Sequence, residues 1–169
     1  VQSGNPFSIA MSDLSLANVY HILGNREKAM EHLEQGRSYA SQRQSKVTMA
    51  LVLMYDAHFA FDGGDEDRGL SLLARSLALA RECGIAIHIT YNPAVALRMC
   101  EKALEHGIEV EYVRHIIRRR HLIPQQSPVH IENWPWAIKI YTLGRFSVLI
   151  DDKPLPPQKK ATQPLKLLK

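Results

Sequence analysis

The histidines and cysteines are the residues whose types could support metal binding or covalent chemistry. Eight histidines are present, but no two have the His-x-x-x-His spacing that places two imidazoles on one helix face, and there is no Cys-x-x-Cys. Cys100 and His106 lie six positions apart on one predicted helix and so point in different directions. No Gly-x-Ser-x-Gly sequence supplies another nucleophile. We therefore expect no metal, no cofactor and no catalytic residue.

The adjacent glycines Gly63 and Gly64 are the nearest approach to a phosphate-binding loop. Such a loop needs the pattern Gly-x-x-x-x-Gly-Lys-Ser/Thr, which the sequence lacks. The two glycines are flanked by Asp62 and Asp65, whose carboxylates would repel phosphate. We expect a turn here and no nucleotide binding.

Basic residues concentrate toward the C-terminal end of the chain. Residues 1–107 contain 10 Lys and Arg against 12 Asp and Glu, whereas residues 108–169 contain 11 against 5. A cluster formed by Arg114, Arg118, Arg119 and Arg120 ends a predicted helix, where each exposed cation stabilises the helix dipole by roughly 0.3–1 kcal/mol. This is the simpler explanation, and contact with DNA phosphate or with an acidic surface is the alternative.

Helical periodicity of apolar residues dominates the first 120 positions. Gly24, Gly84 and Gly107 end helices, and Asn25 and Asn92 are suited to cap the helices that follow them. Cys83 and Cys100 lie on helices beside apolar residues, so we expect reduced thiols in a cytoplasmic protein. No stretch is apolar for long enough to span a bilayer. The predicted helices cover residues 8–23, 26–43, 46–61, 66–83, 92–106 and 109–120.

An internal repeat with an offset of 40 residues relates the first two pairs of helices. Gly24–Ala29 aligns with Gly64–Gly69, and the same offset relates Ala17 to Ala57, Leu33 to Leu73 and Gly36 to Ser76; Gly107 begins a weaker third copy. The pattern Leu16-Ala17-x-x-Tyr20-x-x-x-Gly24-x-x-x-x-Ala29-x-x-x-Leu33-x-x-Gly36 resembles the tetratricopeptide repeat. The period exceeds the 34 residues usual in that family, and longer helices of this kind occur in MalT-like bacterial transcription regulators.

The resemblance implies a concave groove lined by the first helix of each pair. Such a groove binds an extended peptide or a partner helix, and the competing explanation is packing against a neighbouring repeat. By alignment, the lining residues are Asn18, His21, Ile22, Met54, His58, Phe61, Leu97 and Glu101.

The character of the sequence changes after Arg120. Residues 121–133 predict a linker, and residues 138–150, rich in β-branched and aromatic types, predict a short antiparallel β unit with a turn at Asp151-Asp152-Lys153. Trp134 and Trp136 mark a domain junction, where an aromatic pair docks the sheet onto the helices. The alternative is a direct partner contact.

The segment 134–169 resembles the start of the winged-helix domain of OmpR-like and SARP-like activators. The resemblance depends on Ile140–Phe146, on Asp151–Leu155, on Lys160 and on Pro164–Leu168. In such domains a small sheet precedes the helices that enter the DNA major groove. We expect the chain to stop within the first of these helices and to be a fragment of a longer protein.

The expected fold class is mainly α. Residues 1–120 form an antiparallel array of helical hairpins, a tetratricopeptide-like superhelix, and 134–169 add a small antiparallel β unit. The resemblance implies a non-enzymatic protein-interaction and signal-relay scaffold from a bacterial transcriptional regulator. Its partners would be other domains of the parent, or a protein or peptide, with DNA contacted through the complete parent, no membrane, and self-association open. Two alternatives remain: an inducer-sensing domain that uses the groove, and a nucleic-acid-binding module that uses the basic C-terminal third.

Overall fold

The computed structural model describes residues 5–85, 92–143 and 147–155. The chain is mainly helical, with a small antiparallel sheet, as the sequence predicted, and it divides into two compact units, residues 1–133 and 134–169. The predicted helix at the C-terminal end lies outside the described residues. In the described part of the first unit the helices are α1 (Pro6–Ile22), α2 (Arg26–Gln42), α3 (Lys46–Asp62), α4 (Glu66–Glu82), α5 (Pro93–Glu105) and α6 (Val110–Arg120).

Side-chain caps start the helices at the positions that the sequence indicated. The Asn25 side chain accepts the Lys28 backbone N–H at the start of α2, and Asn92 accepts the Ala94 N–H at the start of α5, with Pro93 as the first helical residue. After α1 the chain turns at Gly24, whose φ of +74° lies in the left-handed region. The N–H groups of Gly24 and Asn25 then donate to the last turn of α1.

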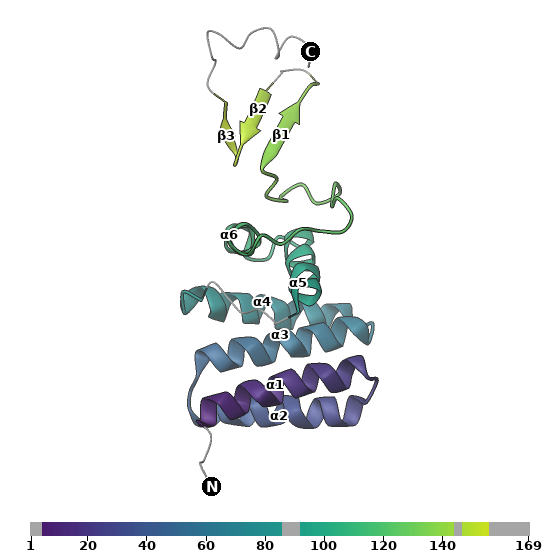
Figure 1. Ribbon diagram of the computed structural model, residues 1–169, viewed down its shortest axis with the longest axis vertical. Helices are drawn as coiled ribbons and strands as arrows, with labels where there is room; N and C mark the ends of the chain where they lie inside the picture. Colours follow the sequence, from purple (N-terminus) through teal and green to yellow (C-terminus); the bar gives the residue numbers. More distant parts are fainter. Residues whose placement is uncertain (1–4, 86–91, 144–146, 156–169) are drawn as a thin grey trace. The chain divides into compact units, whose positions relative to one another are not determined.

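Two pairs of helices form the first part of this unit (Figure 1). α1 packs on α2 and α3 packs on α4, while α2 also contacts α3. Gly36 lies where α2 crosses α1, and a Cβ added there would lie 2.8 Å from Leu14 Cδ2. A larger residue here would force the buried Leu14 side chain to shift, so Gly36 fits the close crossing where the sequence predicts a small residue.

The core of the helical unit is built from the apolar residues that the repeat aligned. Ala17, Ala57, Leu33 and Leu73 are all fully buried. Ser76, which takes the place of Gly36 in the second pair, is also buried, and its hydroxyl donates to the Ala50 carbonyl at 2.6 Å. The hydroxyl is therefore accommodated without an unsatisfied polar group.

The second unit contains a three-stranded antiparallel sheet in the order β1 (Ile138–Tyr141), β2 (Ser147–Ile150) and β3 (Lys153–Pro154). Asp151 and Asp152 both have positive φ, at 49° and 63°, and they join β2 to β3 in the tight turn that the sequence predicted. Residues 144–146 of the proposed winged-helix motif, together with Lys160 and Pro164–Leu168, lie outside the described residues.

Candidate functional site

His21 and His58, two of the predicted groove residues, meet Asp62 at the C-terminal ends of α1 and α3. His21 Nε2 donates to Asp62 Oδ2 at 2.7 Å, and His58 Nε2 lies 3.6 Å from the same oxygen. One ligand-capable atom from each of the three residues lies within 4.8 Å of the other two. The two imidazoles come from different helices, so spacing along a single helix does not relate them.

Two neighbours fix the orientation of this cluster. The Phe59 ring stacks on the His21 ring with centroids 4.0 Å apart and an interplanar angle of 18°. Arg98 of α5 donates from Nη1 to Asp62 Oδ1. The carboxylate therefore presents one oxygen to the guanidinium and the other to the imidazoles.

The cluster shifts the pKa values of its members. Burial lowers the pKa of His58, Asp62 partly offsets this, and His21 and Arg98 lower it further. For Asp62 burial acts to raise the pKa, but hydrogen bonds from Arg98 and His21 prevail, so the pKa is lowered. Near pH 7 His58 is therefore a neutral imidazole facing an ionised carboxylate.

A cleft of about 430 Å³ opens beside the cluster. His21, Phe59 and Asp62 form part of its lining, and charged residues from the helix ends form much of the rest. The lining also includes Gly24, Arg26, Ala29, Met30, Asp56, Ala60, Gly63, Asp65 and Arg68.

The other groove residues predicted on α1 and α3 are distributed differently. Asn18 is half-buried and its Oδ1 atom has no hydrogen-bond partner, whereas Ile22 is 64% exposed. Met54 and Phe61 are core residues, exposed by 2% and 6%. The Phe61 ring occupies the space above Gly69, where an added Cβ would lie 2.5 Å from it. Met54 and Phe61 therefore fill the interior of the helical unit.

Leu97 and Glu101 line a separate cavity of about 1000 Å³ between α5 and residues 120–130. Burial raises the pKa of Glu101, and the nearby Glu105 adds to the effect, whereas His130 opposes it. Leu122 and Ile131, from the predicted linker, are 8% and 3% exposed, so this segment packs as part of the helical unit.

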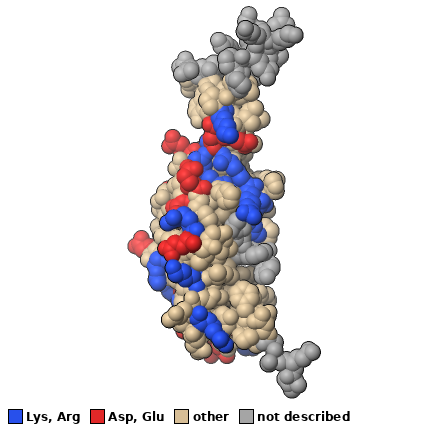
Figure 2. All heavy atoms as spheres, turned by 90° about the vertical axis from the view of Figure 1, so that its left-hand side faces the viewer, with Lys and Arg blue, Asp and Glu red and all other residues tan. Residues whose placement is uncertain are grey.

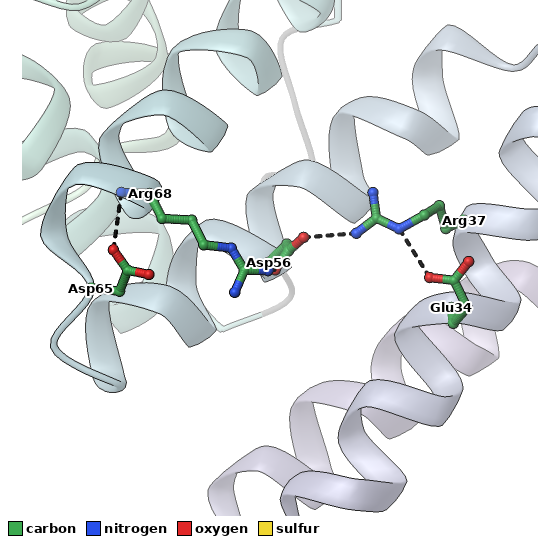
Figure 3. A network of polar contacts seen from close by, with 5 residues as sticks. All are labelled: Glu34, Arg37, Asp56, Asp65 and Arg68. Atoms are coloured by element: carbon green, nitrogen blue, oxygen red, sulfur yellow. Dashed lines mark hydrogen bonds and ion pairs between the residues drawn. The ribbon is translucent and has the colours of Figure 1, made fainter.

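A buried ionic network, which the sequence analysis did not single out, joins three helices. Asp56 of α3 is 4% exposed and accepts from Arg37 Nη2 of α2 at 2.7 Å and from Arg68 Nη2 of α4 at 2.8 Å (Figure 3). Glu34 accepts from Nε of Arg37, and Asp65, the N-cap of α4, accepts the backbone N–H of Arg68. The signal in the sequence is the acidic residue Asp56 within the otherwise apolar middle of α3.

The basic cluster occupies α6 as predicted. Arg118, Arg119 and Arg120 lie in its last turn, Arg119 is exposed, and Arg114 pairs with Glu111 at 2.8 Å. On the face shown in Figure 2, groups of Lys and Arg lie next to groups of Asp and Glu. The placement fits the helix-dipole explanation.

The remaining predicted features are aromatic and thiol side chains. Trp134 is 3% exposed, and its ring centroid lies 6.1 Å from that of Trp136. Cys83 and Cys100 are free thiols, and burial raises the pKa of Cys100 to about 12, which keeps it protonated and unreactive near neutral pH.

An exposed apolar stripe runs along α1. Ile9, Leu16, Val19 and Leu23 are between 41% and 72% exposed and recur at helical spacing. The positions 40 residues later, in α3 and its C-cap, are Met49, Asp56, Phe59 and Gly63, and the first three are buried or half-buried. The face that α3 buries is therefore open on α1.

Comparison with protein-family models, with curated proteins and with solved structures gave no match. Among the described residues, no helix has the length and apolar character needed to cross a bilayer.

Proposed function

We propose that the chain is a protein-interaction scaffold that accepts a partner helix on the open face of α1. The observation that carries this proposal is the apolar stripe Ile9, Leu16, Val19 and Leu23. Contiguous exposed apolar surface is uncommon on monomeric proteins and marks sites of association.

The expected occupant is an amphipathic helix that packs on α1 as α2 packs on α3. The helix pairs support this choice, because α3 and α4 begin and end 40 residues after α1 and α2. On that basis the chain is a tetratricopeptide-like array of hairpins, in which each first helix receives the second helix of the preceding hairpin. The contact between α2 and α3 then shows how the partner helix would pack on α1.

We propose further that the scaffold relays a signal within a bacterial transcriptional regulator. The helical unit and the separate β unit, whose turn at Asp151-Asp152 matches the winged-helix resemblance, support this role. An upstream event would change packing in the hairpins and present the DNA-binding domain. The scaffold has no catalytic part in this scheme.

Site-specific photocrosslinking tests the docking face. A photoreactive residue replaces Val19 in the full-length parent protein, and Val129, which is 82% exposed and lies outside α1, is the matched control position. Crosslinks from position 19 to an amphipathic helix of another domain or partner would support the proposal. Crosslinks to α1 of a second copy would instead identify a self-association face, and a yield no higher than at position 129 would contradict the proposal.

A small-molecule sensor is the second candidate, favoured by the 1000 Å³ cavity that contains Leu97 and Glu101. A ligand bound there would raise the Tm in proportion to the logarithm of its concentration. Leu97→Trp would reduce that rise if the cavity is the binding site.

DNA binding by the basic third is tested by titrating duplex DNA with this chain and with a chain extended about 70 residues past Lys169, at low and high salt. The relay proposal expects sequence preference in the extended chain alone. Specific binding by the shorter chain would favour a nucleic-acid-binding module, and no binding by either would remove the winged-helix hypothesis.

A further inference from the structure

We propose that His21, His58 and Asp62 bind a divalent transition-metal ion of the Zn²⁺ class at the C-terminal ends of α1 and α3. This site is independent of the scaffold proposal, because its residues lie apart from the apolar stripe of α1. Two imidazoles and a carboxylate are a ligand set that suits Zn²⁺ and its first-row neighbours.

The geometry is close to that of a three-ligand site. Bonds of about 2.0–2.2 Å in tetrahedral arrangement place ligand atoms about 3.3 Å apart. The observed separations from Asp62 Oδ2 are 2.7 Å to His21 Nε2 and 3.6 Å to His58 Nε2, and ligand atoms of all three residues lie within 4.8 Å of one another. Side-chain adjustments of roughly an ångström convert the cluster into a ligand shell.

The environment of His58 is the second observation. Its side chain is 7% exposed, its Nδ1 atom has no hydrogen-bond partner, and its Nε2 atom faces Asp62 at a distance too long for a strong hydrogen bond. A buried imidazole with its polar atoms left this way costs free energy. Coordination of an ion by Nε2 would give that nitrogen a strong partner in place of the long contact with Asp62, while Nδ1 would carry the proton and gain no acceptor.

Arg98 contacts the outer side of the Asp62 carboxylate and can keep this contact when an ion binds. It contacts Oδ1 of Asp62, whereas both imidazoles face Oδ2. Metal-ligating carboxylates are commonly held by a second hydrogen bond of this kind, which orients them. Phe59 gives His21 the equivalent support by stacking on its ring.

The adjoining cleft supplies the remaining requirements. His21 and Asp62 line the 430 Å³ cleft, and their side chains are 19% and 32% exposed. An ion can therefore enter from solvent, and a water molecule from the cleft can occupy the fourth position.

The test is a titration of the purified chain with Zn²⁺ by calorimetry, and with Co²⁺ by visible absorption. Cys83→Ser is present throughout to remove a competing thiol. We expect one ion per chain, tetrahedral Co²⁺ bands, and a rise of roughly 5–10 °C in Tm at Zn²⁺ concentrations about 100-fold above the Kd. EDTA should reverse all three effects.

His21→Ala is the decisive variant because His21 is half-buried and its loss leaves the core intact. We expect it to weaken Zn²⁺ binding at least 10-fold, and Asp62→Asn to do the same. His32→Ala is the matched control, since His32 also pairs with an aspartate, Asp13, at 3.0 Å and stacks on an aromatic ring, that of Tyr20.

Several results would overturn the proposal. One is the absence of saturable Zn²⁺ binding to the starting protein. Another is an unchanged Zn²⁺ affinity in a folded His21→Ala variant, and the third is a loss of Zn²⁺ affinity in His32→Ala as large as that in His21→Ala. Each would identify the cluster as an ion-pair network alone.

Discussion

At Asp56 a single carboxylate receives arginines from the helices on both sides of α3, and burial makes the pairing costly to break. The side chain of Asp56 is 6% exposed, whereas those of Arg37 and Arg68 are 29% and 49% exposed. Water can therefore solvate the arginines when the carboxylate is lost, but it cannot replace them around Asp56.

Asp56→Ala is expected to lower the free energy of unfolding by about 2 kcal/mol, because two charge-assisted hydrogen bonds disappear. Glu34→Ala, which removes an exposed partner of Arg37, should cost less than about 0.5 kcal/mol. Urea denaturation measures both. Equal losses would mean that Asp56 is not the centre of the network.

His58 provides the pH-dependent prediction at this scale. Burial lowers its pKa in the folded state, so between about pH 6.5 and that lower value the unfolded chain binds more protons than the folded chain. Stability should fall as the pH falls through this range, by at most about 1.4 kcal/mol per pH unit for one group. Denaturation at pH 7.5 and 5.5 measures the change, which should shrink in His58→Gln and persist in His32→Ala.

The turns between helices belong to the scale of elements. After each of α1 to α5, the residue two positions beyond the last residue of the helix lies in the left-handed region. After α1, α3, α4 and α5 this residue is glycine, but after α2 it is Gln44, with φ 49°. A left-handed residue with a Cβ is strained by roughly 1 kcal/mol.

Gln44→Gly is therefore expected to raise the free energy of unfolding by about 0.5 kcal/mol, the relief of strain being partly offset by the entropy of the unfolded glycine. Gly24→Ala, at φ +74°, should lower it by about 1 kcal/mol. Thermal denaturation of the two variants gives shifts of opposite sign. Shifts of the same sign would contradict this account of the turns.

The open face of α1 gives a prediction about helix pairs. Inserting a second copy of residues 5–44 ahead of Asn5 places an additional α2 before α1, with the same connection that joins α2 to α3. We expect the longer chain to have a Tm several degrees higher, because the stripe on α1 becomes buried. Leu16→Glu in the original α1 should cancel the gain but hardly affect the unextended chain, where Leu16 is 41% exposed.

At the scale of the whole molecule, the boundary of the helical unit is the testable quantity. Residues 121–133 were predicted to be a linker, but Leu122 and Ile131 are buried and the unit extends to Asn133. Residues 1–133 should therefore fold alone with the helical content of the parent chain. Ending at Arg120 should cost about 2–4 kcal/mol, because two buried apolar side chains are lost. Circular dichroism with urea denaturation compares the two, and equal stability would restore the linker interpretation.

The sequence by itself determined the local structure. Apolar periodicity, the caps at Asn25 and Asn92, and the turn at Asp151-Asp152 placed the helices and the β2–β3 connection within about two residues, because these signals act over one or two turns of chain. The 40-residue offset also identified the small and large residues of the helix crossings. His21 and His58 were named, but as separate members of a groove.

The tertiary structure alone decided which residues meet. The cluster of His21, His58, Asp62 and Arg98 depends on α1, α3 and α5. The Asp56 network depends on two contacts between helices, one from α2 and one from α4. Periodicity assigns a residue to a face of its own helix, but the rotation and crossing of packed helices set the distances between faces. For the same reason Met54 and Phe61, predicted to line an open groove, lie in the core, while the apolar stripe of α1 lies open to solvent.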